Sequence, residues 1–158
     1  MKRLALILLL GISPSAYGQT VAQVNDALAS IRAHDQLLVT ALNSIQGMNL
    51  GPEGEVLRAA TDTINFMRAS DDAPIAVANL VRQMRDPADL KAVRTQLRQS
   101  LVGAIRFADI AVNSTNGYLA LLKGPAAVAE MTRARDEMIA IKLAMLALQV
   151  DAGPPTSH

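Results

Sequence analysis

The side chains best suited to catalysis are few in this sequence and are not arranged as a catalytic site. The chain has 158 residues, no Cys, and two His, of which His158 is the last residue. A Ser-His-Asp arrangement would have to use His34, but Asp35 is its immediate neighbour, and adjacent side chains on a helix do not face each other. The sequence contains no glycine-rich phosphate loop, nucleophile elbow or HExxH motif. We therefore expect no enzymatic activity.

The sequence also lacks the motifs that bind haem and metal ions. There is no Cys-x-x-Cys-His for haem attachment and no pair of Glu-x-x-His motifs for a di-iron centre. Met residues recur every seven positions near the C-terminus, but a spacing of ~10 Å along a helix is too long for one shared Cu(I) ion. We expect no cofactor and no metal. We interpret the stripe as a seam of the core or of an oligomer, made of Met131, Met138, Ile141, Met145 and Leu148.

Four basic residues form the clearest candidate binding feature, and we call them the basic stripe: Lys91, Arg94, Arg98 and Arg106. On a helix they fall within roughly a third of a turn, beside an apolar face, and no acidic residue lies between the first and the last. The stripe could face an acidic protein partner or anionic lipid. It could also be solvated, or pair inside the protein with the acid-rich segment 53–72.

Asp35 is a candidate buried polar residue because it occupies a position in an apolar seam. Steps of three and four residues place the other seam members on one face of a long helix: Val21, Val24, Leu28, Ile31, Leu38, Leu42 and Ile45. A carboxylate at such a position is costly unless it is paired. Asp35 either fixes the helix register through a buried Arg or faces a solvent-filled widening of the bundle.

Helical spacing extends over nearly the whole mature chain, and no segment shows convincing strand periodicity. Asp86 and Pro87 form the clearest helix start, with a capping side chain followed by a proline at the first helical position. Residues 70–74 are expected to interrupt one helix, and residues 113–117 could break or kink another. Short connections make neighbouring helices antiparallel. We predict an all-α, up-down four-helix-bundle-like domain with one broken arm, its arms spanning 20–49, 54–85, 87–122 and 125–150.

The N-terminus has the three regions of a cleaved signal peptide. A short basic start precedes an apolar run over 4–12, and Ala16 and Gly18 place small residues at the −3 and −1 positions of a cut before Gln19. The run is much shorter than the ~20 residues of a spanning helix. Export and an excess of Arg over Lys indicate a bacterial periplasmic or secreted protein. The predicted organisation is a signal peptide over 1–18, a helical bundle over 19–150 and a loose tail over 151–158.

Charge and hydropathy narrow the classes of partner. Cleavage would leave 13 basic and 14 acidic residues, too little positive charge for a nucleic-acid-binding protein. Residues 139–150 are apolar nearly all round, which predicts burial. Four arms can hardly cover such a helix on every side, so an oligomer or a partner helix could cover the remainder.

Together these features favour a cofactor-free helical protein that acts through protein–protein contacts. The first hypothesis is an accessory subunit of an envelope or secretion assembly, which binds another envelope protein or itself. The second is an inhibitor or immunity protein that binds an envelope enzyme or toxin. The third is a lipid-binding protein at the membrane surface, which would use the basic stripe and the apolar last helix.

Overall fold

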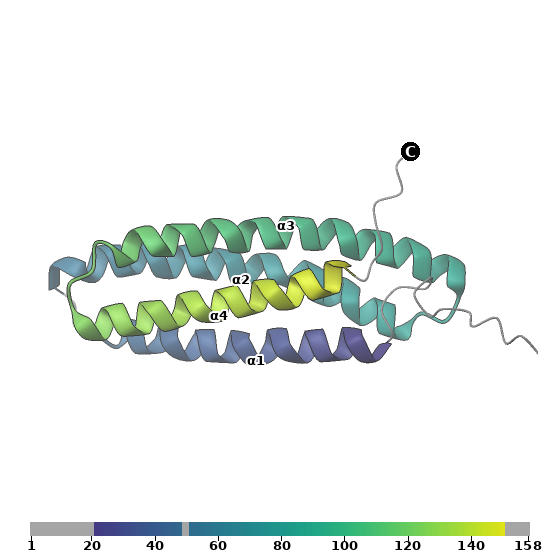
Figure 1. Ribbon diagram of the computed structural model, residues 1–158, viewed down its shortest axis with the longest axis horizontal. Coiled ribbons are helices and arrows are strands. Elements are labelled where there is room, and N and C mark those ends of the chain that lie inside the picture. The colour runs from purple at the N-terminus through teal and green to yellow at the C-terminus, as the bar shows by residue number, and fades with distance from the viewer. Residues whose placement is uncertain (1–20, 49–50, 151–158) are drawn as a thin grey trace, which may run out of the picture.

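The computed structural model describes residues 21–48 and 51–150, and within them the chain forms four long helices and no strand. The helices are α1 (Val21–Gln46), α2 (Gly54–Gln83), α3 (Pro87–Leu119) and α4 (Pro125–Val150), with a single 3₁₀ turn, η2 (Gly51–Glu53), before α2. Consecutive helices run in opposite directions, side by side along one long axis (Figure 1). The prediction of an all-α, up-down helical bundle is confirmed.

The four helices do not contact one another equally. α1 packs along α4, α2 packs along α3, and α3 packs along α4, whereas α1 and α2 make the least extensive contact of the neighbouring pairs. The bundle is therefore closed tightly on three sides and more loosely on the fourth, between α1 and α2.

The helix ends follow local rules that the sequence encodes. The Asp86 side chain caps α3 and accepts hydrogen bonds from the backbone N–H of Ala88 at 2.8 Å and of Asp89 at 3.5 Å. Gly51 has a φ of 44°, a left-handed conformation that favours glycine. Near it, the Glu53 carboxylate accepts hydrogen bonds from the backbone N–H of Lys123 at 2.8 Å and of Gly124 at 3.2 Å. This contact ties the start of α2 to the α3–α4 connection.

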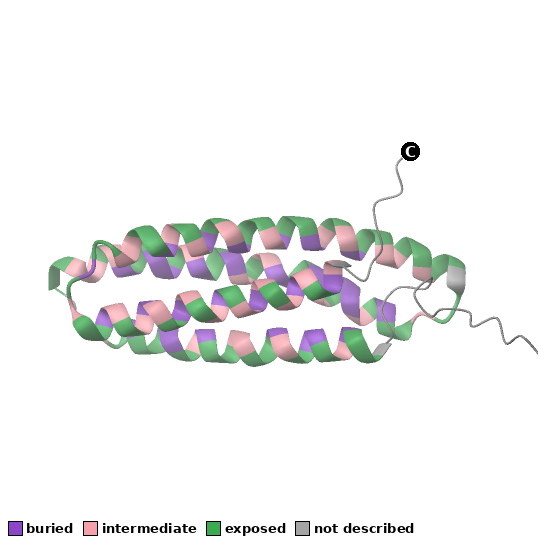
Figure 2. Ribbon diagram, in the orientation of Figure 1, coloured by how far each residue is buried: buried purple, intermediate pink, exposed green. Residues whose placement is uncertain are grey.

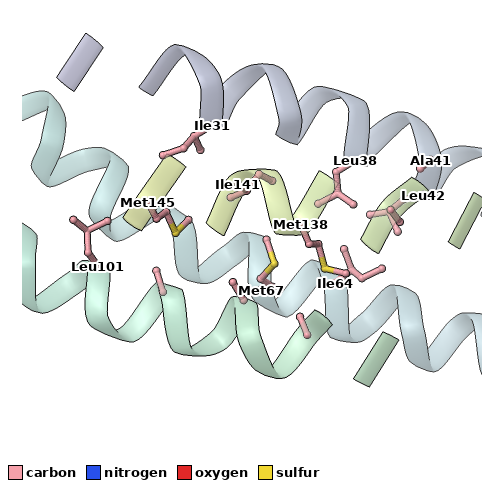
Figure 3. Packing of buried hydrophobic residues seen from close by; sticks show 14 of the residues in the cluster. Ile31, Leu38, Ala41, Leu42, Ile64, Met67, Leu101, Met138, Ile141 and Met145 are labelled. Carbon is pink, nitrogen blue, oxygen red and sulfur yellow. The ribbon is translucent and has the colours of Figure 1, made fainter. Parts of the chain in front are cut away.

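The core is aliphatic. On the α3 side it is filled by small residues, and on the α4 side by Met. Buried residues face the interior along all four helices (Figure 2). α3 contributes several alanines, among them Ala104, Ala108 and Ala111, and α4 contributes Met side chains that are fully buried. Figure 3 shows the side chains of Met138 and Met145 in the interior of the bundle. A flexible thioether chain suits the irregular space that small facing residues leave.

The expected interruption at residues 70–74 does not end the helix. α2 continues through Pro74 to Gln83, and its ribbon changes direction in the second half (Figure 1). A proline inside a helix removes one backbone hydrogen bond and costs roughly 3 kcal/mol. Buried residues on both sides of it, including Met67, Val77 and Val81, keep the two halves packed in the core. Burial on this scale offsets the local cost.

The predicted weak point at residues 113–117 is also helical. α3 runs through it to Leu119, and Thr115 in its middle is fully buried. A glycine inside a helix costs about 1 kcal/mol, which the packing of α3 against its neighbours overcomes. The third arm is therefore continuous.

Two predicted segments, the signal peptide over 1–18 and the tail over 151–158, lie outside the described residues. Within the described residues, no helix combines the length and the apolar character that crossing a membrane requires. The four helices cover residues 139–150 only in part, as expected for an apolar helix in a bundle of four arms. Ile139 and Leu143 are 37% and 59% exposed, because α4 packs along α1 and α3 and no other described helix covers its outer face.

Candidate functional site

A pocket of about 300 Å³ opens where the bundle is least closed, between α1 and α2. Pro74 lies in the same part of α2 and is itself buried. The change of direction in α2 and the polar residue in the α1 seam together keep the two helices from packing closely here. The pocket walls combine charged and apolar side chains, among them Ile31, Asp35, Arg68, Asp71, Asp72 and Ile75.

Asp35 and Arg68 form an ion pair across the two helices. The guanidinium Nε donates to Asp35 Oδ1 at 2.6 Å and Nη2 donates to Oδ2 at 3.0 Å, a bidentate geometry. The hydrogen bond to Asp35 raises the pKa of Arg68 above its usual value. Asp35 was a candidate for a buried polar residue, and it is only half-buried: its side chain is 36% exposed, because the pocket opens beside it. Both expected alternatives, an Arg partner and a widening of the bundle, occur at this one position.

Asp71 is the buried acid of this region, and the sequence analysis did not single it out. It is only 4% exposed although it lines the pocket. The pKa of Asp71 is raised to about 7, mainly by burial and also by the charges of Asp35 and Asp72, while a hydrogen bond from Ser70 and the charge of Arg68 act in the opposite direction. The Asp-Asp pair before a proline was interpreted as a break, and a continuous helix instead turns one of the two acids inward. Its i+4 spacing from Met67 is the signal that would have found it.

His34 does not line the pocket. His34 is the only His within the described residues, and its Nδ1 lies 2.7 Å from Glu137 Oε2 on α4. It therefore points to a different helix from Asp35, as their adjacent positions predicted. The described residues also contain no group of three or more His, Cys, Asp or Glu side chains that could hold a metal ion. The buried carboxyl group of Asp71 can bind a proton or a positive charge.

The basic stripe lies along α3, away from this pocket, and its members differ in exposure. Lys91 and Arg106 are exposed. Arg94 and Arg98 are half-buried and interact with other groups of the chain. The structure therefore does not present all four cations equally to a partner.

The five residues of the candidate seam in α4 are all buried within the chain. Met131, Met138, Ile141 and Met145 have no exposed surface and Leu148 has 1%. Their burial is provided by the other helices of the same chain, so these side chains are placed in the core and do not form a surface for a second copy.

A second feature that the sequence analysis missed lies on the outside of α2 and α3. Phe66 and Phe107, the two phenylalanines of the chain, touch each other edge to face, with ring centroids 5.2 Å apart and planes at 83°. They are 62% and 38% exposed. On the same outer side of α3, Val102 and Ile110 are 53% and 51% exposed, each four positions from Arg106. We call these five residues the aromatic face.

The pattern contained a signal for this face. Ile64 and Met67 lie on the buried face of α2, and helical spacing turns Phe66, which lies between them in the sequence, away from that face. Aromatic side chains usually fill cores, so two exposed ones in contact indicate a surface with a use other than folding. The structure thus contains two candidate sites, the α1–α2 pocket and the aromatic face. No family model, curated protein or solved structure matches this chain.

Proposed function

We propose that the protein is an exported, cofactor-free helical bundle that acts by binding another protein, as an accessory subunit of an envelope assembly. The observation that carries the proposal is the exposed contact between Phe66 and Phe107. Large aromatic side chains are enriched among the residues that dominate binding energies at protein interfaces. Two rings already in contact lose little conformational freedom when a partner covers them.

The charges near the aromatic face define the chemistry of the partner. Arg106 lies between Val102 and Ile110 on α3, whereas the other exposed cation of the basic stripe, Lys91, lies about 22 Å further along the helix axis, outside the aromatic face. No Asp or Glu lies between Lys91 and Arg106 in the sequence. The proposed partner is therefore a protein that offers an apolar hollow for the two rings, bordered by carboxylates.

Site-specific photocrosslinking tests this proposal. A photoreactive phenylalanine analogue replaces Phe66 in the tagged chain, and envelope extract from the source cells supplies the partner. The control carries the analogue at Leu37, which is 39% exposed on α1. We expect one protein to be crosslinked from position 66 and not from position 37, with lower yield at high salt because exposed charges are screened.

A matched pair of variants connects the crosslink to binding. Phe107→Ala with Arg106→Glu removes one ring and reverses one charge of the aromatic face, whereas Leu37→Ala with Arg133→Glu makes the same kind of change on α1 and α4, outside both candidate sites. We expect the double variant in the aromatic face to abolish capture of the partner and the control double variant to leave capture unchanged. Equal capture by both, or equal crosslinking from both positions, would overturn the proposal.

The other two hypotheses predict different outcomes in the same assay. If the captured protein is an enzyme or toxin whose activity the bundle suppresses, the protein is an inhibitor. If no protein is captured and anionic vesicles bind the chain in a manner that Arg106→Glu abolishes, the target is a membrane surface. Either result would replace the accessory-subunit assignment.

A further inference from the structure

The pocket between α1 and α2 contains a carboxyl group without a contacting cation. Asp71 is 4% exposed and lines the pocket. In the part of the chain that the structure describes, no basic side chain forms an ion pair with it. Arg68, whose charge acts on Asp71, is held by two hydrogen bonds to Asp35. A buried carboxylate in this position is costly, and it lacks its own counter-ion.

Ser70 gives the carboxyl group only a long hydrogen bond. Its hydroxyl lies 3.4 Å from Asp71 Oδ1, where it acts to lower the pKa of Asp71, but 2.6 Å from the backbone carbonyl oxygen of Met67. A hydroxyl group has one hydrogen, and the shorter contact competes for it. The Asp71 carboxyl therefore either keeps its own proton, which it can share with the Ser70 oxygen, or is open to a cation that enters the pocket.

The walls of the pocket favour one kind of cation. Ile31, Ala69 and Ile75 give the pocket apolar surface, and Asp72 adds a second carboxylate to its lining. A volume of about 300 Å³ is at the lower end of the range for small-molecule sites. A metal ion would need more ligands, and the described residues contain no suitable group of three. A ligand with a positive charge on a short carbon chain would match both the carboxylates and the apolar side chains that line the pocket.

We infer that this pocket binds a small organic amine, with its ammonium group on Asp71 and its carbon chain against Ile31 and Ile75. The ammonium replaces the carboxyl proton as the positive charge, so binding releases a proton wherever Asp71 was protonated. Arg32 also lines the pocket, and its guanidinium would hold the carboxylate of an α-amino acid. The site lies on a different side of the bundle from the aromatic face, so this inference does not rest on the proposed partner.

Titration with n-butylamine, followed by nuclear magnetic resonance of the backbone amides of the full chain, tests the inference. The comparison probe is 1-butanol, which has the same carbon chain without the charge. We expect the amine to shift the amides around the pocket at about pH 8, and roughly hundredfold weaker binding at about pH 5, because a carboxyl group with a pKa of about 7 is then almost fully protonated. The alcohol should give no saturable shift in the pocket.

Two substitutions on α2 separate the site from general charge effects. Asp71→Asn removes the proposed counter-ion, whereas Asp62→Asn removes an exposed acid of the same helix that does not line the pocket. We expect the first to weaken amine binding by roughly tenfold or more and the second to leave it unchanged. Circular dichroism establishes that both variants are folded.

The titration of Asp71 itself gives an independent readout. Its carboxyl carbon, followed by carbon-13 resonance, should titrate at a lower pH in the presence of butylamine than in its absence. Stronger binding of norvaline than of butylamine, lost in Arg32→Gln, would identify an amino acid as the preferred amine. Unchanged titration of Asp71, equal binding to wild type and Asp71→Asn, or equal binding of the alcohol would each overturn the inference.

Discussion

α1 meets its two neighbours in different ways, although both contacts use the same helix. On its α4 side the seam is apolar, and the facing Met138, Ile141 and Met145 have no exposed surface. On its α2 side the contact is less extensive, Asp35 interrupts the seam, and a pocket of about 300 Å³ remains. The difference teaches that one helix can form a closed interface on one face and an open interface on another, and here the open one lies where a polar seam residue faces a helix with an internal proline.

The same contrast applies to the polar contacts at the two interfaces. His34 pairs with Glu137 on the α4 side, beside closed packing, and neither residue lines the α1–α2 pocket. Asp35 pairs with Arg68 on the α2 side, beside the pocket that contains Asp71. Polar pairs are therefore compatible with either kind of interface, and the surrounding apolar packing decides which one forms.

The largest expected effect on the free energy of unfolding comes from lost packing at the closed interface between α1 and α4. Met138→Ala removes a fully buried side chain from α4, and we expect it to lower the free energy of unfolding by about 2 to 5 kcal/mol. Leu37→Ala on the exposed side of α1 should change it by about 0.5 kcal/mol or less. Urea denaturation followed by circular dichroism measures both. A small effect of Met138→Ala would show that the closed interface does not hold the bundle together.

The next largest effect is a pH dependence of stability that Asp71 causes at the open interface between α1 and α2. The pKa of Asp71 is raised to about 7, so the folded state keeps a proton that the unfolded state loses above about pH 4. The free energy of unfolding of the wild type should therefore fall, relative to that of Asp71→Asn, as the pH rises from about 4 to about 7. Above pH 7 we expect the variant to be more stable by about 2 to 4 kcal/mol.

Urea denaturation at several pH values measures this difference. The groups whose charges act on Asp71 are Asp35 on α1 and Arg68 and Asp72 on α2, and they are unchanged in the variant. Asp62→Asn is the control, because it removes an exposed acid from the same helix. A constant difference between wild type and Asp71→Asn across this pH range would contradict the expected protonation of Asp71.

A smaller effect is expected from Pro74→Ala, which restores a backbone donor inside α2. The gain in helix stability of roughly 3 kcal/mol is partly offset by the buried ring that is lost, so we expect a net stabilisation of about 1 kcal/mol. The substitution should also narrow the pocket and weaken the binding of n-butylamine. Thermal unfolding and the amide titration measure the two effects, and unchanged amine binding would show that the proline does not shape the pocket.

The smallest effect is expected at the ion pair itself. Asp35 and Arg68 are about one-third exposed, so breaking the pair with Arg68→Met should cost about 1 kcal/mol or less, and the cost should shrink at high salt. Chemical denaturation at two salt concentrations measures it. A cost of several kcal/mol that salt does not change would mean that the pair behaves as a buried one and that the α1–α2 side is less open than we conclude.

The sequence by itself determined the helices, most of their ends and most of the core. Apolar spacing predicted the α1 seam, six of whose side chains are buried: Val24, Leu28, Ile31, Leu38, Leu42 and Ile45. The cap at Asp86 was also predicted. These features depend on residues a few positions apart, where periodicity and capping act directly.

Only the tertiary structure decided where the chain departs from local preference. Pro74 stays inside a helix because packing on both of its sides outweighs the lost hydrogen bond. Asp35 meets Arg68 from 33 positions away, and Phe66 meets Phe107 across two helices. Such contacts depend on how whole helices are placed beside each other. Both candidate sites arise from these long-range placements, which local patterns along one chain do not encode.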